Sequence, residues 1–155
     1  MASRIVSGIA PALKSARPPQ GPKLRGPRAR LEDKEHLRLI RLLPCLASGE
    51  MPAGEAAHVR FASAAYGKQI TGTGTRPDDK WAVPLCPRLH TMASDAQHRS
   101  GEEWWWKQRN INPLLVASQL YATSTALREA KTPEADILRV MSSIVKAARR
   151  SANDR

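Results

Sequence analysis

The first regular alternation of apolar and charged positions is LEDKEHLRLIRLL, residues 31–43. Its apolar residues recur at roughly helical spacing, at Leu31, Leu37, Ile40 and Leu43. Acidic residues cluster near its start, where the helix dipole favours anions, and Pro44 follows its end. The pattern predicts a helix that stops before Pro44.

Turns and short extended runs are predicted for the next part of the chain. Gly49, Pro52 and Gly54 divide CLASGEMPAGEAAHVRF into turns, after which a short extended run holds His58. GKQITGTGTRPDD has the composition of a loop and lacks the Gly-Lys-Ser/Thr ending of a phosphate-binding P-loop. WAVPLC is typical of a short strand, and Pro84 restricts it to a sheet edge or a strand end. We therefore expect a His-bearing hairpin with a Gly-rich loop.

Helices are predicted for the remainder of the chain. One is expected around QHRSGEEWWWKQR, and the next starts with Asn112 as N-cap and Pro113 at its first position. Thr132 and Pro133 open a last, amphipathic helix over residues 132–150 in the same way. Its apolar positions would face the core or a protein partner: Ile137, Val140, Met141, Ile144 and Val145. Helices around one short hairpin predict an α+β fold.

The run Trp104, Trp105 and Trp106 lies beside the cations Lys107 and Arg109. Exposed aromatic rings could stack on bases while the cations contact phosphate. Consecutive helical positions cannot share one face, however. We expect two of the rings in the core and one more exposed, with nucleic-acid contact as the lesser alternative.

Length and composition limit the architecture. A chain of 155 residues with 41% hydrophobic content can bury one modest core. It contains neither the apolar core of a signal peptide nor an apolar run of about 18 residues, so no membrane partner is expected. Two cysteines do not form a disulfide framework in a chain of this size, and reduced thiols in the cytoplasm are the expectation.

The net charge of +11 is concentrated at the N-terminus. Residues 1–31 hold seven Lys or Arg and no acid, which leaves +4 for the remainder. Five prolines in the same segment remove backbone donors, so residues 1–30 are expected to be a disordered basic tail. Arg25, Arg28 and Arg30 would bind nucleic acid electrostatically. A tail without a partner and an organelle transit peptide are the alternatives.

Four blocks of the sequence, taken in order, resemble the prophage-associated branch of the HNH endonuclease superfamily. They are RLEDKEHLRLIRLLPCLASG, EAAHVRFASAAYGK, TGTGTRPDDKWAVPLCPRLH and DAQHRSGEEWWWKQRNINPLLVASQLYA. The resemblance implies a small ββα-metal (HNH-like) finger surrounded by helices, within a domain of residues 31–128. In such a finger a hairpin presents one histidine, and a following helix supplies imidazole to a divalent cation.

The resemblance assigns roles to three histidines. His58 in EAAHVR matches the general base that deprotonates the attacking water, a task that suits a neutral imidazole. The alternative is that His58 only caps or packs a turn. His90 and His98 match the metal-side histidines, and the cation would act as a Lewis acid on the phosphate. Mg²⁺, Mn²⁺, Ni²⁺ and Zn²⁺ all remain open as the cation.

Asp79 in RPDDK falls near the family's middle polar position, which either orients the base or binds the ion. Asp78 competes with it for that role. An ordinary cap or turn carboxylate is an equally good interpretation of either residue.

The sequence departs from the family at its structural zinc. Cys45 and Cys86 match two zinc ligands, but Ser48 and Leu89 occupy the other two positions. Because a closed zinc site needs four ligands, we expect no structural zinc and two buried, unligated thiols. The segment between His90 and His98 is also longer than in close relatives.

The resemblance implies a metal-dependent DNA endonuclease of HNH type, related to phage DNA processing. A degenerate HNH fold that binds DNA or assists recombination without catalysis is the first alternative. An adaptor that docks on another protein through its C-terminal helix is the second.

Overall fold

The computed structural model describes residues 29–71, 74–99 and 101–154, and these combine helices with one small sheet. Its elements follow in the order α1 (Lys34–Leu42), β1 (Glu55–His58), η1 (Ala64–Tyr66), η2 (Asp79–Trp81), β2 (Ala82–Leu85), η3 (Arg88–Met92), α2 (Glu102–Lys107), α3 (Pro113–Glu129) and α4 (Glu134–Asn153). The expected α+β class is therefore confirmed. Most of the tail predicted for residues 1–30, with Arg25 and Arg28, lies outside the described residues.

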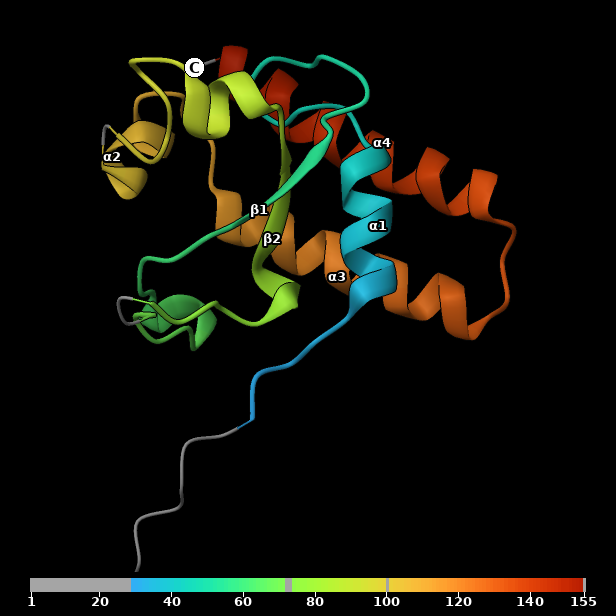
Figure 1. Ribbon diagram of the computed structural model, residues 1–155. Helices are drawn as coiled ribbons and strands as arrows, with labels where there is room; N and C mark the ends of the chain where they lie inside the picture. The colour runs from blue at the N-terminus through green and yellow to red at the C-terminus, as the bar shows by residue number, and fades with distance from the viewer. Residues whose placement is uncertain (1–28, 72–73, 100, 155) are drawn as a thin grey trace, which may run out of the picture.

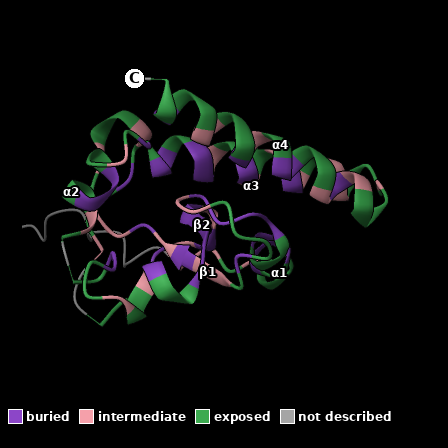
Figure 2. Cartoon of the chain, turned by 90° about the horizontal axis from the view of Figure 1, so that it is seen from above, coloured by how far each residue is buried: buried purple, intermediate pink, exposed green. Residues whose placement is uncertain are grey.

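The elements form two layers (Figures 1 and 2). Helices α3 and α4 lie side by side in one layer, and the β1–β2 hairpin and α1 lie in the other. The buried residues of both layers face each other across the space between them (Figure 2). Of the predicted apolar face of the last helix, Ile137, Met141 and Val145 are buried and Ile144 packs against the core, whereas Val140 is 36% exposed. Most of this stripe therefore serves the core.

Side-chain N-caps mark the start of α1 and α3. The Asp33 carboxylate accepts a hydrogen bond from the His36 amide at 2.9 Å at the start of α1. Asn112 caps α3 as predicted, because its side-chain oxygen accepts from the Leu115 amide at 3.1 Å and Pro113 follows it. Helix α4 has Pro133 rather than Thr132 as its N-cap, and it continues to Asn153, beyond the predicted end at residue 150.

The two strands pair antiparallel, with Glu55 opposite Leu85 and His58 opposite Ala82. In a two-stranded sheet both strands are edge strands, so Pro84, which has no N–H to donate, lies at a sheet edge as predicted. Its carbonyl accepts from the Leu46 amide at 2.8 Å, which ties β2 to the segment after α1. All four residues of β2 are buried, because α1 and α3 both pack against this strand.

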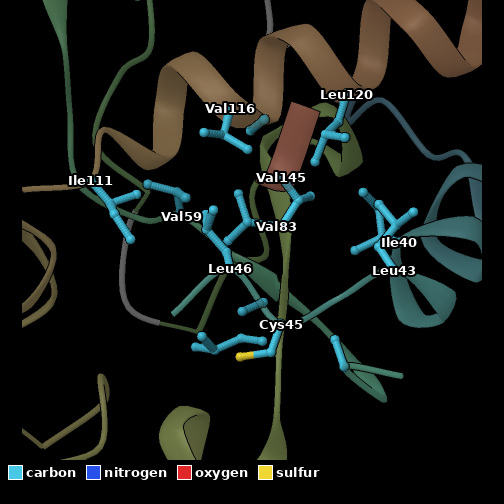
Figure 3. Packing of buried hydrophobic residues seen from close by; sticks show 14 of the residues in the cluster. Ile40, Leu43, Cys45, Leu46, Val59, Val83, Ile111, Val116, Leu120 and Val145 are labelled. Atoms are coloured by element: carbon cyan, nitrogen blue, oxygen red, sulfur yellow. The ribbon is translucent and has the colours of Figure 1, made fainter. Parts of the chain in front are cut away.

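The core lies between the layers and is built mainly from aliphatic side chains (Figure 3). It includes Ile40, Leu43, Leu46, Val59, Val83, Val116, Leu120 and Val145. Trp105 and Trp106 are each only 1% exposed, whereas Trp104 is 58% exposed. The prediction of two core rings and one outer ring is confirmed. The helix that carries them is shorter than expected, since Gly101 precedes it with φ of +78° and residues 97–99 form turns.

None of the helices in the described ranges is long and apolar enough to cross a membrane.

Candidate functional site

Three histidines that are distant in sequence line one hollow of about 380 Å³. His58 comes from the end of β1, His90 from η3, and His98 from the turn that follows. Arg60 and Arg76 also line the hollow, and its described lining contains no carboxylate. The site is therefore rich in imidazole and guanidinium, a composition suited to an anion such as phosphate.

The strand positions one side of the hollow. Ala56, His58 and Arg60 alternate along the chain and all line it, whereas Ala57 and Val59 between them are fully buried in the core. This is the period of two expected of extended chain. Beyond the strand, Arg60 also donates through Nη2 to the Thr75 carbonyl at 3.1 Å and so links the chain after β1 to another segment that lines the hollow.

The other two imidazoles are brought together by a turn. The backbone N–H of Gln97 donates to the Leu89 carbonyl at 2.9 Å, and the backbone N–H of His98 donates to the His90 carbonyl at 3.4 Å. The chain after η3 thus folds back on η3. The ring centroids of His90 and His98 consequently lie 4.6 Å apart.

His58 forms a dyad with Asp79. Its Nε2 lies 2.9 Å from Oδ1 of Asp79, whose side chain is 1% exposed. The tautomer that donates from Nε2 to this carboxylate keeps a lone pair on Nδ1, which is the form a general base needs. Asp79 is absent from the lining of the hollow, so it lies behind His58 rather than beside His90 and His98.

The segment before α1 holds Asp79 and Asp78 in place. The Asp33 amide donates to Oδ2 of Asp79 at 2.9 Å, and the Leu31 amide donates to Oδ1 of Asp78 at 2.8 Å. The Asp79 amide donates in return to the Leu31 carbonyl at 3.0 Å. Arg30 adds a guanidinium 3.4 Å from Oδ1 of Asp79. Asp78 therefore anchors backbone, while Asp79 is the carboxylate that reaches the histidine.

The surroundings of the dyad keep the imidazole neutral and the carboxylate charged. Burial lowers the pKa of His58, and the attraction of Asp79 only partly opposes this. Burial pushes the pKa of Asp79 upward, but hydrogen bonds from the Asp33 amide and His58, with the charge of Arg30, hold it below its ordinary value. A neutral imidazole beside an ionised carboxylate can accept a proton and then be stabilised as imidazolium.

His90 connects a carboxylate to the second imidazole. Its Nδ1 lies 2.6 Å from Oε2 of Glu55, and its Nε2 lies 2.9 Å from Nε2 of His98. Burial, followed by the proximity of His90, lowers the pKa of His98, which favours its neutral form. Histidines that bind metals commonly donate their other ring N–H to a carboxylate in this way.

The donor set of this pair fits a cation. Two imidazole nitrogens bound at about 2.1 Å are about 3.0 Å apart at the right angle of an octahedral site and about 3.4 Å apart in a tetrahedral one, so the observed 2.9 Å is closer to the octahedral separation. The fit is incomplete, because no group of three or more His, Cys, Asp or Glu side chains within the described residues could hold a metal. His90 and His98 could thus supply two ligands, while Asp79 is engaged by His58.

A half-buried glutamate, Glu102, connects the two segments that carry the hollow's histidines. Glu102 accepts from the Arg60 amide at 2.9 Å and from Nε2 of Gln97 at 2.9 Å, so it joins the chain after β1 to the turn before His98. Burial raises its pKa. Glu102 does not line the hollow, and its effect on the site is structural.

The two cysteines lie together in the core, away from the hollow. Both are buried, as expected, and neither forms a disulfide; the Cys86 amide donates to Sγ of Cys45 at 3.3 Å. The hydroxyl of Ser48 lies 3.8 Å from Sγ of Cys86, and Leu89 is also buried.

Among the residues predicted to bind nucleic acid, those that the structure describes are dispersed. Arg25 and Arg28 lie outside the described residues, and Arg30 contacts Asp79 and Glu32. Arg109 stacks over the Trp105 ring at 3.6 Å, and Lys107 is exposed on α2. Neither of the last two lines the hollow.

Three site residues were missed by the sequence reasoning: Glu55, Arg60 and Arg76. Arg60 could have been found, since it follows His58 by two positions and alternation places it on the same face. Glu55 carried no such signal, because its contact with His90 spans 35 residues of chain.

In comparisons with known proteins, no family model, curated protein or solved structure matches the chain.

Proposed function

We propose that this protein is a metal-dependent DNA endonuclease of HNH type, related to phage DNA processing. The observation that carries the proposal is the convergence of His58, backed by Asp79, and the His90–His98 pair on one cationic hollow. A ββα-metal finger would need a hairpin followed by a helix, and here the β1–β2 pair is followed by η3, a π-helix of five residues.

His58 would act as the general base. Its Nδ1 would take the proton from a water that attacks the phosphorus, and Asp79 would stabilise the resulting imidazolium through Nε2. The P–O bond to the leaving sugar oxygen would break at the same centre, and that oxygen would take its proton from solvent water. Because burial keeps the pKa of His58 below its ordinary value, the base is unprotonated at neutral pH.

The phosphate would be held by the cations that line the hollow. Arg60 and Arg76 offer N–H donors to its oxygens, and the absence of carboxylate from the described lining avoids repulsion. A divalent cation held by His90 and His98 would supply Lewis-acid stabilisation of the charge that develops on the phosphate. Glu55 would orient His90 for that role.

The test is nicking of supercoiled plasmid in Mg²⁺, Mn²⁺, Ni²⁺ or Zn²⁺ by the purified protein and by His58→Ala. Cleavage by the wild type, lost in the variant, supports the proposal. Equal nicking by both would remove His58 as the base. The exposed Trp104→Ala variant is a control for damage caused by substitution itself.

The non-catalytic alternative, a degenerate HNH fold that binds DNA or assists recombination, is favoured by one observation. The Nε2 atoms of His90 and His98 are close enough to hydrogen-bond to each other, and the described residues offer no third ligand. A protein of this kind would shift DNA with strong salt dependence but would leave it uncut in every metal.

A further inference from the structure

A second hollow, of about 620 Å³, adjoins the one that holds the histidines. The two share Thr75, Arg76 and Pro77, so a strand of nucleic acid could pass from one to the other along this segment. The second hollow has four cationic side chains in its described lining and one carboxylate, that of Asp78.

The charged groups of the second hollow are engaged to different degrees. The Asp78 carboxylate accepts from the Leu31 amide, which offsets part of its charge. Lys68 is 5% exposed and donates to the Arg60 and Gln69 carbonyls, so it braces the wall. Arg30 is paired with Asp79 and Glu32.

Lys80 and Arg76 are better placed to meet an anion. The ammonium of Lys80 lies 4.8 Å from the centre of the Trp81 ring, a contact that leaves its three N–H donors for other partners. Arg76 is exposed and lines both hollows. These two cations therefore extend the positive lining of the first hollow into the second.

We infer that the second hollow binds the backbone phosphate next to the one that would be cleaved, with Lys80 as its principal contact. This inference rests on the proposed function, which places the cleaved phosphate in the first hollow. Phosphates recur at every nucleotide, and two adjoining cationic hollows suit a strand rather than an isolated ion. Contacts to phosphate position a strand without reading its sequence, so this subsite would hold the substrate with little base preference.

The experiment measures binding without cleavage. A fluorescein-labelled single-stranded 12-mer is titrated in EDTA at several salt concentrations with the wild-type full chain, Lys80→Ala, Lys80→Arg and Lys146→Ala. Lys146 is a matched control because it is exposed on α4. Loss of one phosphate contact should lower the slope of log K against log salt by about 0.7, which weakens binding about fivefold at 0.1 M salt.

The expected result is this loss in Lys80→Ala, recovery in Lys80→Arg, and wild-type binding in Lys146→Ala. Wild-type affinity and slope in Lys80→Ala would overturn the subsite, whether or not the wild type cuts DNA. If Lys80→Ala reduces the salt slope but the wild type cuts no DNA, the nuclease proposal is overturned and the phosphate subsite still stands. Poly-glutamate that competes as well as the oligonucleotide would show an acidic-protein site instead, and would overturn the nucleic-acid assignment.

Discussion

The Asp79 carboxylate reaches Nε2 of His58 across 21 residues of chain, at 2.9 Å. The same carboxylate accepts the Asp33 amide, so one buried acid links the end of β1 to the start of α1. The orientation of the histidine therefore depends on both contacts.

Asp79→Asn should slow plasmid nicking by about 100-fold or more, because general-base catalysis contributes at least this much. The amide can present its N–H to His58 and favour the tautomer in which Nδ1 carries the proton. Nicking rates at saturating metal measure the effect. Asp95→Asn is the control, since Asp95 is exposed and lies outside the hollow. An Asp79→Asn protein that nicks at the wild-type rate would show that the dyad has no catalytic role.

Glu55→Gln should weaken divalent metal binding by about 10- to 100-fold, the usual effect of removing a carboxylate behind a metal-binding histidine. Calorimetric titration with Mn²⁺, Ni²⁺ and Zn²⁺ measures the affinity directly. Glu103→Gln serves for comparison because Glu103 is exposed on α2. If the two variants bind metal equally, the contact between Glu55 and His90 serves another purpose.

Acid should destabilise the fold partly through His36. This residue is fully buried in α1, its Nδ1 lies 2.7 Å from the Ser124 hydroxyl, and burial lowers its pKa to about 4. The unfolded chain binds a proton near pH 6.5 and the folded chain only near pH 4, so stability falls as pH drops through this window. The loss attributable to His36 is about 2 kcal/mol between pH 7 and 4.5.

Urea unfolding of the wild type and of His36→Leu at both pH values measures how much of the stability lost on acidification is due to His36. The wild type should lose more stability on acidification than the variant does. Equal losses in the two proteins would mean that other groups, such as the paired Asp33, account for the acid sensitivity.

Trp105→Ala should lower the free energy of unfolding by about 3–5 kcal/mol, because it empties a large buried volume. The exposed neighbour Trp104→Ala should change it by no more than about 0.5 kcal/mol. Urea denaturation followed by circular dichroism compares the two. Similar losses at both positions would contradict the burial of the Trp105 ring.

Local rules predicted those parts of the fold that depend on neighbouring residues. Asn112 and Pro113 start α3 because capping involves only the next few amides. The tryptophan run divides between core and surface because adjacent helical positions point in different directions. Helix α2 begins later than the apolar pattern suggested, because the positive φ of Gly101 separates the helix from the turn before it.

The site was predictable only in part, for a physical reason. The three histidines were found by resemblance, and the structure does bring them to one hollow. Adjacent residues such as Asp78 and Asp79 look alike in a sequence. Their contacts differ, because Asp78 accepts the Leu31 amide and Asp79 accepts the Asp33 amide, and each of these contacts spans more than 40 residues.

The pairing of residues 31–33 with the Asp78–Asp79 turn makes the beginning of the fold a component of its chemistry. Shortening the chain to start at Lys34 would remove two amides that bind these carboxylates and the carbonyl that accepts the Asp79 amide. The trimmed protein would lose the Asp33 cap of α1 but keep its hydrophobic interior, and Asp79 would no longer be held where it orients the His58 imidazole. Deletion of residues 31–33 would then impair the site much as a substitution of His58 does.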